Sequence, residues 1–232
     1  FDGRSYWVPL VVSENVVGRL AVGGFKERLD TTAIEFLRLA GIYASTLVRN
    51  VELQTSLGRR VEALTTLFEV GQALASTLEA DKVLRLAVEG AVRLAGAASC
   101  SIMLLDERGE TLRIRASVGV PEAIVQTAVR KVGEGISGRV VQSGQALFAR
   151  DIHKTLGVRT DGPTRYRSPA FICMPLAASG RVLGVINVND KREGEFTQED
   201  VNLVSLLANQ AAFSLENARM HSQLWQTSVT DG

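Results

Sequence analysis

The sequence is poor in cysteine, proline and histidine, and it has no excess of charge of either sign. Its 232 residues include two cysteines, five prolines and two histidines, with 26 basic side chains against 25 acidic ones. Two cysteines far apart in the chain exclude a disulfide-stapled scaffold and fit a reducing compartment. The balanced charge gives no support for binding nucleic acid or an acidic membrane surface.

Long apolar runs are also missing. No stretch approaches the about 20 apolar residues that span a bilayer, and no basic segment followed by an apolar one opens the chain. These absences predict a cytoplasmic protein, or a piece of a larger one, without membrane insertion.

Patterns that carry chemistry are scarce as well. The sequence shows no Ser/His/Asp set, no paired catalytic carboxylates and no His/Cys cluster with metal-ligand spacing. The glycine-rich stretch "VGEGISG" at 132–138 lacks the Lys-Ser/Thr ending of a phosphate-binding loop and follows no predicted strand. We therefore expect no metal site and no catalytic residue, and hence no enzyme in this chain.

What the sequence does contain is a long-range repeat. The stretch "WVPLVVSENVVGRLAVGGFK" from Trp7 matches "CMPLAASGRVLGVINVNDK" from Cys173, with Gly18 and Gly184 at the same offset. Each copy predicts strand, turn, strand and then a long helix. The copies lie about 165 residues apart, far beyond the about 20–50 residues of stacked repeats. We therefore expect two copies of one larger domain.

The domain boundaries follow from this repeat. Residues 1–56 are expected to be the C-terminal part of a first domain whose front half lies outside the sequence. Residues 57–220 form the complete copy, and 221–232 form an exit helix toward an output domain that is also missing. The complete copy predicts two amphipathic helices over 59–96, a hairpin over 98–117, short helices, a polar loop at 153–169, a second hairpin and a long helix from Thr197.

This order predicts an α+β fold. We expect an antiparallel sheet with long helices on one face and short helices and loops on the other, joined to the partial copy by a long helix. The ordered stretches "SCSIMLLDERGETLRIRASVG", "GEGISGRVVQSGQALFARDI", "RYRSPAFICMPL" and "GVINVNDKREGEFTQEDVNLVSLLANQAAFSLENA" resemble a GAF domain, a relative of the PAS fold.

The resemblance implies a sensory or regulatory module of a signalling protein, which binds a small molecule and passes the signal to a fused output. The Asp-Gly at 231–232 is similar to the start of a GGDEF diguanylate cyclase domain, and a histidine kinase remains an alternative output. A second hypothesis is a GAF domain that binds no ligand and serves only for dimerisation or as a spacer.

In this family the ligand lies between the sheet and the short helices, under the long loop. Alternate strand positions then predict the pocket walls. Asn187 is the strongest candidate, because a polar side chain within an apolar strand needs a partner; the alternative is a hydrogen bond to backbone inside the core. The candidate ligand-binding residues are Phe148, Asp151, Tyr166, Phe171, Cys173, Asn187 and Asn189.

The ligand itself stays open. Asn189, Lys191, Phe196 and Asp200 match part of a motif of cyclic-nucleotide-binding GAF domains, although the extra Asp190 interrupts it; alternatively, Thr197 caps the long helix there.

Basic residues outnumber acidic ones between 108 and 167, which favours an anionic ligand such as a cyclic nucleotide, or else forms a solvated surface. The loop holds His153 but no cysteine, so no covalent chromophore is expected, and haem ligation by His153 alone stays open.

The two cysteines allow a third hypothesis. Cys100 and Cys173 fall in predicted strands, where a buried cysteine acts as a small apolar side chain. The alternative is a thiolate of the kind used by the free methionine sulfoxide reductases of the GAF family.

A helix–helix seam is predicted from 31 to 78, where proline and turn clusters are missing. The seam breaks at Gln54 and Gly58 lies close by, so a local distortion is expected there. The pattern predicts a parallel homodimer. Its apolar or small positions are Leu37, Ala40, Ala44, Leu47, Val51, Leu57, Val61, Leu64 and Phe68.

Overall fold

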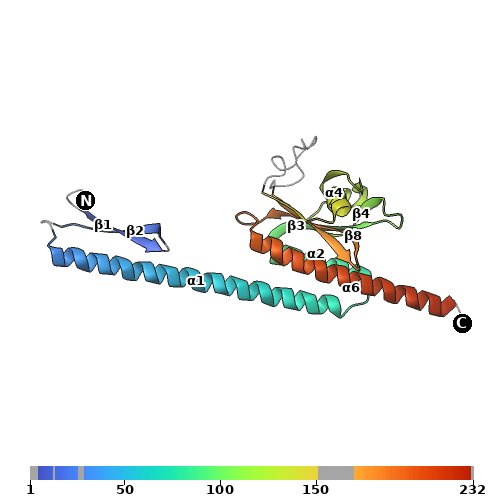
Figure 1. Cartoon of the computed structure of the whole chain (residues 1–232), viewed down its shortest axis with the longest axis horizontal. Helices are drawn as coiled ribbons and strands as arrows, with labels where there is room; N and C mark the ends of the chain where they lie inside the picture. Colours follow the sequence, from blue (N-terminus) through green and yellow to red (C-terminus); the bar gives the residue numbers. More distant parts are fainter. Residues whose placement is uncertain (1–4, 13, 26–28, 151–169, 231–232) are drawn as a thin grey trace. The chain divides into compact units, whose positions relative to one another are not determined.

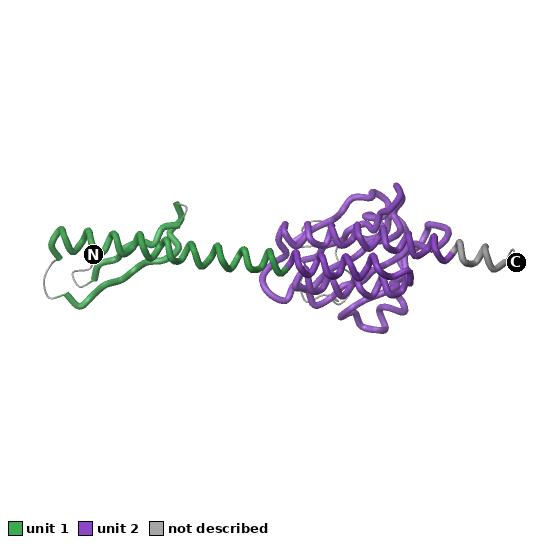
Figure 2. The backbone as a smooth tube through the Cα atoms, turned by 90° about the horizontal axis from the view of Figure 1, so that it is seen from below, with its two compact units in different colours: residues 1–62 green, residues 63–232 purple. Residues whose placement is uncertain are grey.

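The computed structural model describes residues 5–12, 14–25, 29–150 and 170–230. The chain divides into two compact units, residues 1–62 and 63–232, which Figure 2 distinguishes by colour. Within the described ranges, no helix combines the length and the apolar character that crossing a membrane requires.

Unit 1 is a hairpin on a helix. Strands β1 (Ser5–Val12) and β2 (Asn15–Gly23) pair antiparallel and lie along the first half of α1 (Thr31–Ala75), as Figure 1 shows. A side chain at Gly41 would collide with Val8, so glycine lets the hairpin approach the helix. The hydroxyl of Ser45 accepts a hydrogen bond from the backbone N–H of Val11 at 3.1 Å and fixes the contact.

Unit 2 is built on a six-stranded sheet in which every neighbouring pair is antiparallel. The strand order is β5-β4-β3-β8-β7-β6. The strands are β3 (Ala97–Leu105), β4 (Thr111–Val118), β5 (Val129–Lys131), β6 (Leu147–Ala149), β7 (Phe171–Ala178) and β8 (Arg181–Lys191). The helices are α2 (Ala80–Leu94), α3 (Glu122–Thr127), α4 (Gly135–Ser143) and α6 (Gln198–Thr230).

Helices cover the two faces of this sheet unequally. The end of α1 with α2 and α6 covers one face, where Leu74, Ile102 and Leu215 belong to the larger core. The short α4 covers the other face, where Val140 packs with Cys173 in a smaller core (Figure 1). The predicted α+β architecture, with long helices on one face and short elements on the other, is therefore confirmed. We call the two sides the long-helix face and the α4 face.

The two hairpins of the repeat have the same pairing register. Leu10 pairs with Gly18 in unit 1, and Leu176 pairs with Gly184 in unit 2. In both hairpins the register shifts directly after the leucine. Such an irregularity bends and twists a strand locally, so the sequence match extends to a shared local backbone feature.

Helix α1 is helical throughout its 45 residues. The helix is not interrupted at Gln54 or Gly58, because one exposed glycine costs only about 1 kcal/mol in a helix of this length. The predicted local distortion stays a prediction.

Only the first part of the predicted seam on α1 needs correction, since Leu37, Ala40 and Ala44 are half-buried where Gly41 and Ser45 lie against the hairpin. The other six predicted positions are exposed. A stripe with alternating steps of three and four continues these positions along the helix. This α1 stripe consists of Phe36, Ala40, Tyr43, Leu47, Asn50, Gln54, Leu57, Val61, Leu64 and Phe68, all exposed except the half-buried Ala40.

Candidate functional site

Four polar side chains cross the middle of the sheet on the α4 face. Ser99 pairs with Asn189, and Ser101 pairs with Asn187, between the adjacent strands β3 and β8. Directly paired residues point to the same face of a sheet, and so do residues two positions apart in one strand. We call Ser99, Ser101, Asn187 and Asn189 the polar row.

The polar row is largely withdrawn from water. Ser99, Ser101 and Asn189 are only 5%, 8% and 7% exposed, and Asn187 is half-buried. The row interrupts a face that is otherwise apolar, since Met103 and Val185 continue it along the same two strands. The hydroxyl and amide groups of this row are the hydrogen-bonding side-chain groups of an otherwise apolar face, so the row is the part of the α4 face that offers contacts to a polar molecule.

Helix α4 contributes Ser137 to this site. The Ser137 hydroxyl donates a hydrogen bond to Oδ1 of Asn187 at 3.2 Å, so the partner of Asn187 is a side chain and not the backbone. Gly138 follows, and a side chain there would collide with the carbonyl of Lys131. The glycine thus allows the start of α4 to lie close enough for Ser137 to reach the sheet.

The structure brings together four of the seven predicted site residues. Phe171 pairs with Asn189, and Cys173 pairs with Asn187, so strand β7 adds both to the same face. Phe148 does not join them, because it pairs with Ile172 and packs against the larger core on the long-helix face. The predicted residues Asp151 and Tyr166 lie outside the described residues, as does His153.

Sequence reasoning missed Ser99, Ser101 and Ser137. The alternation of "SCSIM", in which serines flank Cys100, was the available signal for the two residues of β3. Ser137 had no such signal, because its role depends on where α4 packs against the sheet. Among the described residues, no group of three or more histidine, cysteine, aspartate or glutamate side chains could hold a metal ion.

The two thiols lie in different layers and are held neutral. Cys100 belongs to the larger core, and burial raises the pKa of its thiol well above the usual range. Cys173 belongs to the smaller core, where burial raises its pKa to about 12, although a hydrogen bond with Ser137 acts in the opposite direction. Since the thiolate is the nucleophilic form, neither cysteine is activated for attack in this structure.

The motif at 189–200 forms a buried clamp. The Nζ of Lys191 donates to both carboxylate oxygens of Asp200 at 2.8 Å and to the carbonyl of Ala95 at 2.7 Å. Asp200 accepts from the backbone N–H of Thr197, and the Thr197 hydroxyl accepts in turn from the N–H of Asp200. Phe196 is buried with the Lys191 ammonium 5.4 Å from its ring centre. This geometry matches the alternative in which Thr197 caps the helix.

The part of the chain that contains these residues matches a known protein family. The family model described as "GAF domain" matches residues 77–216, which include the polar row and the clamp. The chain belongs to the GAF domain family.

Two curated proteins resemble this chain in sequence. The nitrogen fixation protein AnfA of Azotobacter vinelandii is 31% identical over 48% of the chain, and this alignment covers 22% of AnfA. The probable 3',5'-cyclic phosphodiesterase pde-5 of Caenorhabditis elegans is 24% identical over 62% of the chain, with 21% of that protein covered. The chain thus spans about a fifth of the length of these curated relatives.

A solved structure supports the same fold. The GAF domain from the Acinetobacter phosphoenolpyruvate-protein phosphotransferase superposes with a TM-score of 0.59. It is 24% identical, and the match covers 68% of this chain and 94% of that one. In this GAF domain, the α4 face carries the hydrogen-bonding groups of the polar row, and the clamp connects β8, α2 and α6.

Proposed function

We propose that this chain is a sensory or regulatory GAF module that binds a small molecule on the α4 face and acts without catalysing a reaction itself. The observation that carries this proposal is the polar row, which places two amides and two hydroxyls on a largely apolar, buried sheet face. A ligand with several hydrogen-bonding groups would match it, with Phe171 as an apolar wall and Ser137 as a donor from the opposite side.

A cyclic nucleotide is one candidate ligand. A relative of this chain is described as a probable 3',5'-cyclic phosphodiesterase, and the polar row offers groups that can bind a base or a ribose. The support comes from the row and not from Lys191 and Asp200, whose polar atoms are engaged in the clamp.

The tandem arrangement is also a proposal. The shared register and the shared irregularity of the two hairpins support the hypothesis that unit 1 is the tail of a second GAF domain. In this proposal, α1 connects two sensory domains and α6 leads toward a fused output such as a cyclase or kinase.

We further propose that two copies of the chain associate in parallel along the α1 stripe. Its apolar side chains are strongly exposed, with Phe68 at 71% and Leu64 at 61%. Ligand binding would bias the rotation or register of the paired helices, and the helices would pass that bias to the output domain. The protein would act in the cytoplasm, where two free cysteines remain reduced.

Binding measurements test the ligand proposal. Native mass spectrometry of gently purified protein would look for a retained small molecule, and calorimetry would measure binding of 3',5'-cyclic AMP and 3',5'-cyclic GMP. Asn187→Ala is expected to weaken the binding of a retained ligand by about 1 kcal/mol or more, the scale of a lost neutral hydrogen bond. Asn209→Ala on the exposed side of α6 is the matched control.

The alternatives give different results in the same experiments. A ligand-free spacer would retain no molecule and bind neither nucleotide, yet would still dimerise. A thiol-dependent reductase would reduce free methionine sulfoxide and lose that activity in Cys173→Ser; the buried, neutral thiols in separate layers disfavour it. Binding unaffected by Asn187→Ala would contradict the polar row as the site.

A further inference from the structure

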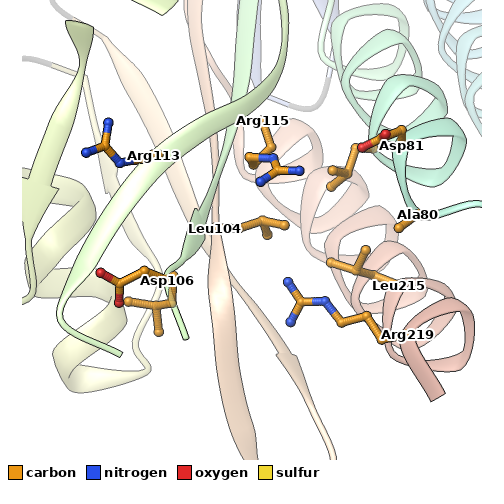
Figure 3. Close-up of a pocket in the computed structure, with 10 residues that line it drawn as sticks. Ala80, Asp81, Leu104, Asp106, Arg113, Arg115, Leu215 and Arg219 are labelled. Atoms are coloured by element: carbon orange, nitrogen blue, oxygen red, sulfur yellow. The ribbon is translucent and has the colours of Figure 1, made fainter. Parts of the chain in front are cut away.

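A recess opens on the long-helix face of unit 2, on the opposite side of the sheet from the polar row. It has a volume of about 210 Å³ and lies between β4, the start of α2 and α6 (Figure 3). Its inner wall is apolar, since it includes the buried side chains of Leu84, Leu104 and Leu215. The recess therefore combines side chains of α2, β3, β4 and α6.

Arginines surround this recess. Arg113 pairs with Leu104 across the sheet, and because Leu104 faces the helices, Arg113 faces them as well. Arg115 lies two residues further along β4, and Arg219 comes from α6. In Figure 3 the guanidinium groups of Arg115 and Arg219 approach the space beside Leu104 from opposite sides. The basic residues of β4, which suggested an anionic ligand, thus lie away from the α4 face.

The charge around the recess is positive on balance. Two carboxylates, Asp81 and Asp106, also line it. Asp106 is engaged in the β3–β4 turn, where it accepts from the Thr111 hydroxyl at 2.6 Å and from the backbone N–H of Glu110 at 2.9 Å. Within the described ranges, none of the three arginines forms an ion pair. Asp81 is thus the carboxylate of the recess that would compete most with an anionic ligand for the three arginines.

We propose that this recess is a second ligand site, which binds a small carboxylate with a compact apolar body. Arg115 and Arg219 hold the carboxylate, since a guanidinium group binds a carboxylate through two parallel hydrogen bonds. Leu84, Leu104 and Leu215 contact the apolar body. The volume lies below the about 300–1,000 Å³ of sites for larger ligands, so the ligand is small.

Occupation of the recess would connect the sheet to α6. Arg219 and Leu215 belong to α6, whereas Arg115 and Leu104 belong to strands β4 and β3. A carboxylate between the two guanidinium groups would offset their mutual repulsion and draw the helix toward the sheet. This site is independent of the polar row, and its occupant can therefore differ from the ligand proposed for the α4 face.

Benzoate is a suitable probe, with benzamide as its neutral counterpart of similar shape. Methyl NMR spectra of the full chain would follow the leucine signals during titration. Benzoate is expected to shift the methyl signals of Leu84, Leu104 and Leu215, whereas benzamide shifts them far less. Arg115→Gln with Arg219→Gln should weaken benzoate binding about tenfold or more, and Asp81→Asn should strengthen it.

The control variants separate this proposal from general effects. Arg93→Gln, at the other end of α2, should leave benzoate binding unchanged, and so should Asn187→Ala in the polar row. Equal shifts from benzamide, unchanged binding in the double arginine variant, or no leucine shift at about 1 mM benzoate would each overturn the proposal. Since Asn187→Ala tests only the α4 face, failure at one site is distinguishable from failure at the other.

Discussion

In the clamp around Lys191, the charged residues of the motif bind each other and stabilise the fold. The side chains of Lys191 and Asp200 are only 15% and 12% exposed, and their ion pair joins the end of β8 to the start of α6. Removing one partner of such a pair leaves a buried charge without compensation, which is more costly than replacing both partners.

We expect Asp200→Ala to lower the free energy of unfolding by about 3 kcal/mol or more, because it removes both the partner of Lys191 and the reciprocal cap at Thr197. Adding Lys191→Met to this variant should cost little further. Urea denaturation of the double-mutant cycle measures both effects. Glu193→Gln, an exposed change nearby, should stay within about 0.5 kcal/mol. Additive losses from the two single variants would contradict a coupled pair.

The buried thiols make stability depend on pH at the alkaline end. Their pKa values are raised in the folded state, so the folded protein keeps protons that the unfolded chain releases. This contribution to stability is fully present below about pH 8.5, the ordinary thiol pKa, and is lost as pH rises toward 12.

We therefore expect unfolding free energy to fall between about pH 9 and 12, by at most about 1.4 kcal/mol per pH unit for each thiol. In the double variant Cys100→Ala with Cys173→Ala, the unfolding free energy should decrease less per pH unit, even if its value at neutral pH also differs from that of the parent. Chemical denaturation at several pH values measures the slope. Equal slopes in the two proteins would mean that other groups control the alkaline loss.

Strand periodicity could predict part of the site at this scale. Phe171 and Cys173, like Asn187 and Asn189, follow the alternation of long strands and share one face as expected. Phe148 lies in a strand of three residues, which is too short for its own sequence to fix which face a side chain takes. Ser137 depends on tertiary packing, which periodicity does not describe.

At the scale of elements, α1 presents an unusual combination of exposed apolar residues and two polar ones. The α1 stripe keeps a seven-residue repeat through Asn50 and Gln54. Polar residues at core positions of a coiled coil fix register and partner number at a cost in stability. The predicted seam agrees with the α1 stripe over its second half and departs from it only near the hairpin, because the side of the helix facing the hairpin is also apolar or small.

We expect Leu57→Glu with Leu64→Glu to give monomers, because both changes would place charge within the paired stripe. Light scattering at several concentrations measures the mass. Arg59→Glu, on the opposite side of α1, is the matched control and should leave the dimer intact. A dimer that survives Leu57→Glu with Leu64→Glu would rule out association through the stripe.

Replacing the polar pair should have the opposite effect on stability. Asn50→Leu with Gln54→Leu is expected to raise the thermal midpoint of the dimer while relaxing its register. Disulfide trapping reports the register, with single cysteines introduced at Val61 and, in separate proteins, at its neighbouring positions. With the parent stripe, only the cysteine at Val61 should crosslink the two chains. In Asn50→Leu with Gln54→Leu, cysteines at neighbouring positions should crosslink as well. A lower midpoint would show that the stripe remains unpaired.

At the scale of the whole molecule, the two units differ in how completely they are built. Unit 2 has six strands with helices on both faces, whereas the described part of unit 1 has two strands on one helix. A two-stranded hairpin is marginal in water, because few contacts support each backbone hydrogen bond. The repeat in the sequence predicted two related hairpins and a complete copy only in the second, and both cores described above lie in unit 2.

We expect amide hydrogens of β1 and β2 to exchange much faster than those of β3 and β8. Hydrogen–deuterium exchange followed by mass spectrometry measures this, with peptides from α2 as an internal reference for the core of unit 2. Comparable protection in the two hairpins would mean that unit 1 is supported by contacts beyond those described.

The placement of one cysteine on each side of the sheet equips the protein with a pair of internal reporters. Neither thiol can meet a labelling reagent until the layer above it opens, and each label then records which layer opened. Cys173 lies under the single short helix α4, whereas Cys100 lies under several long helices. The labelling rate of Cys173, measured by mass spectrometry, should therefore exceed that of Cys100. A molecule that binds the α4 face should lower the labelling rate of Cys173 and leave that of Cys100 unchanged.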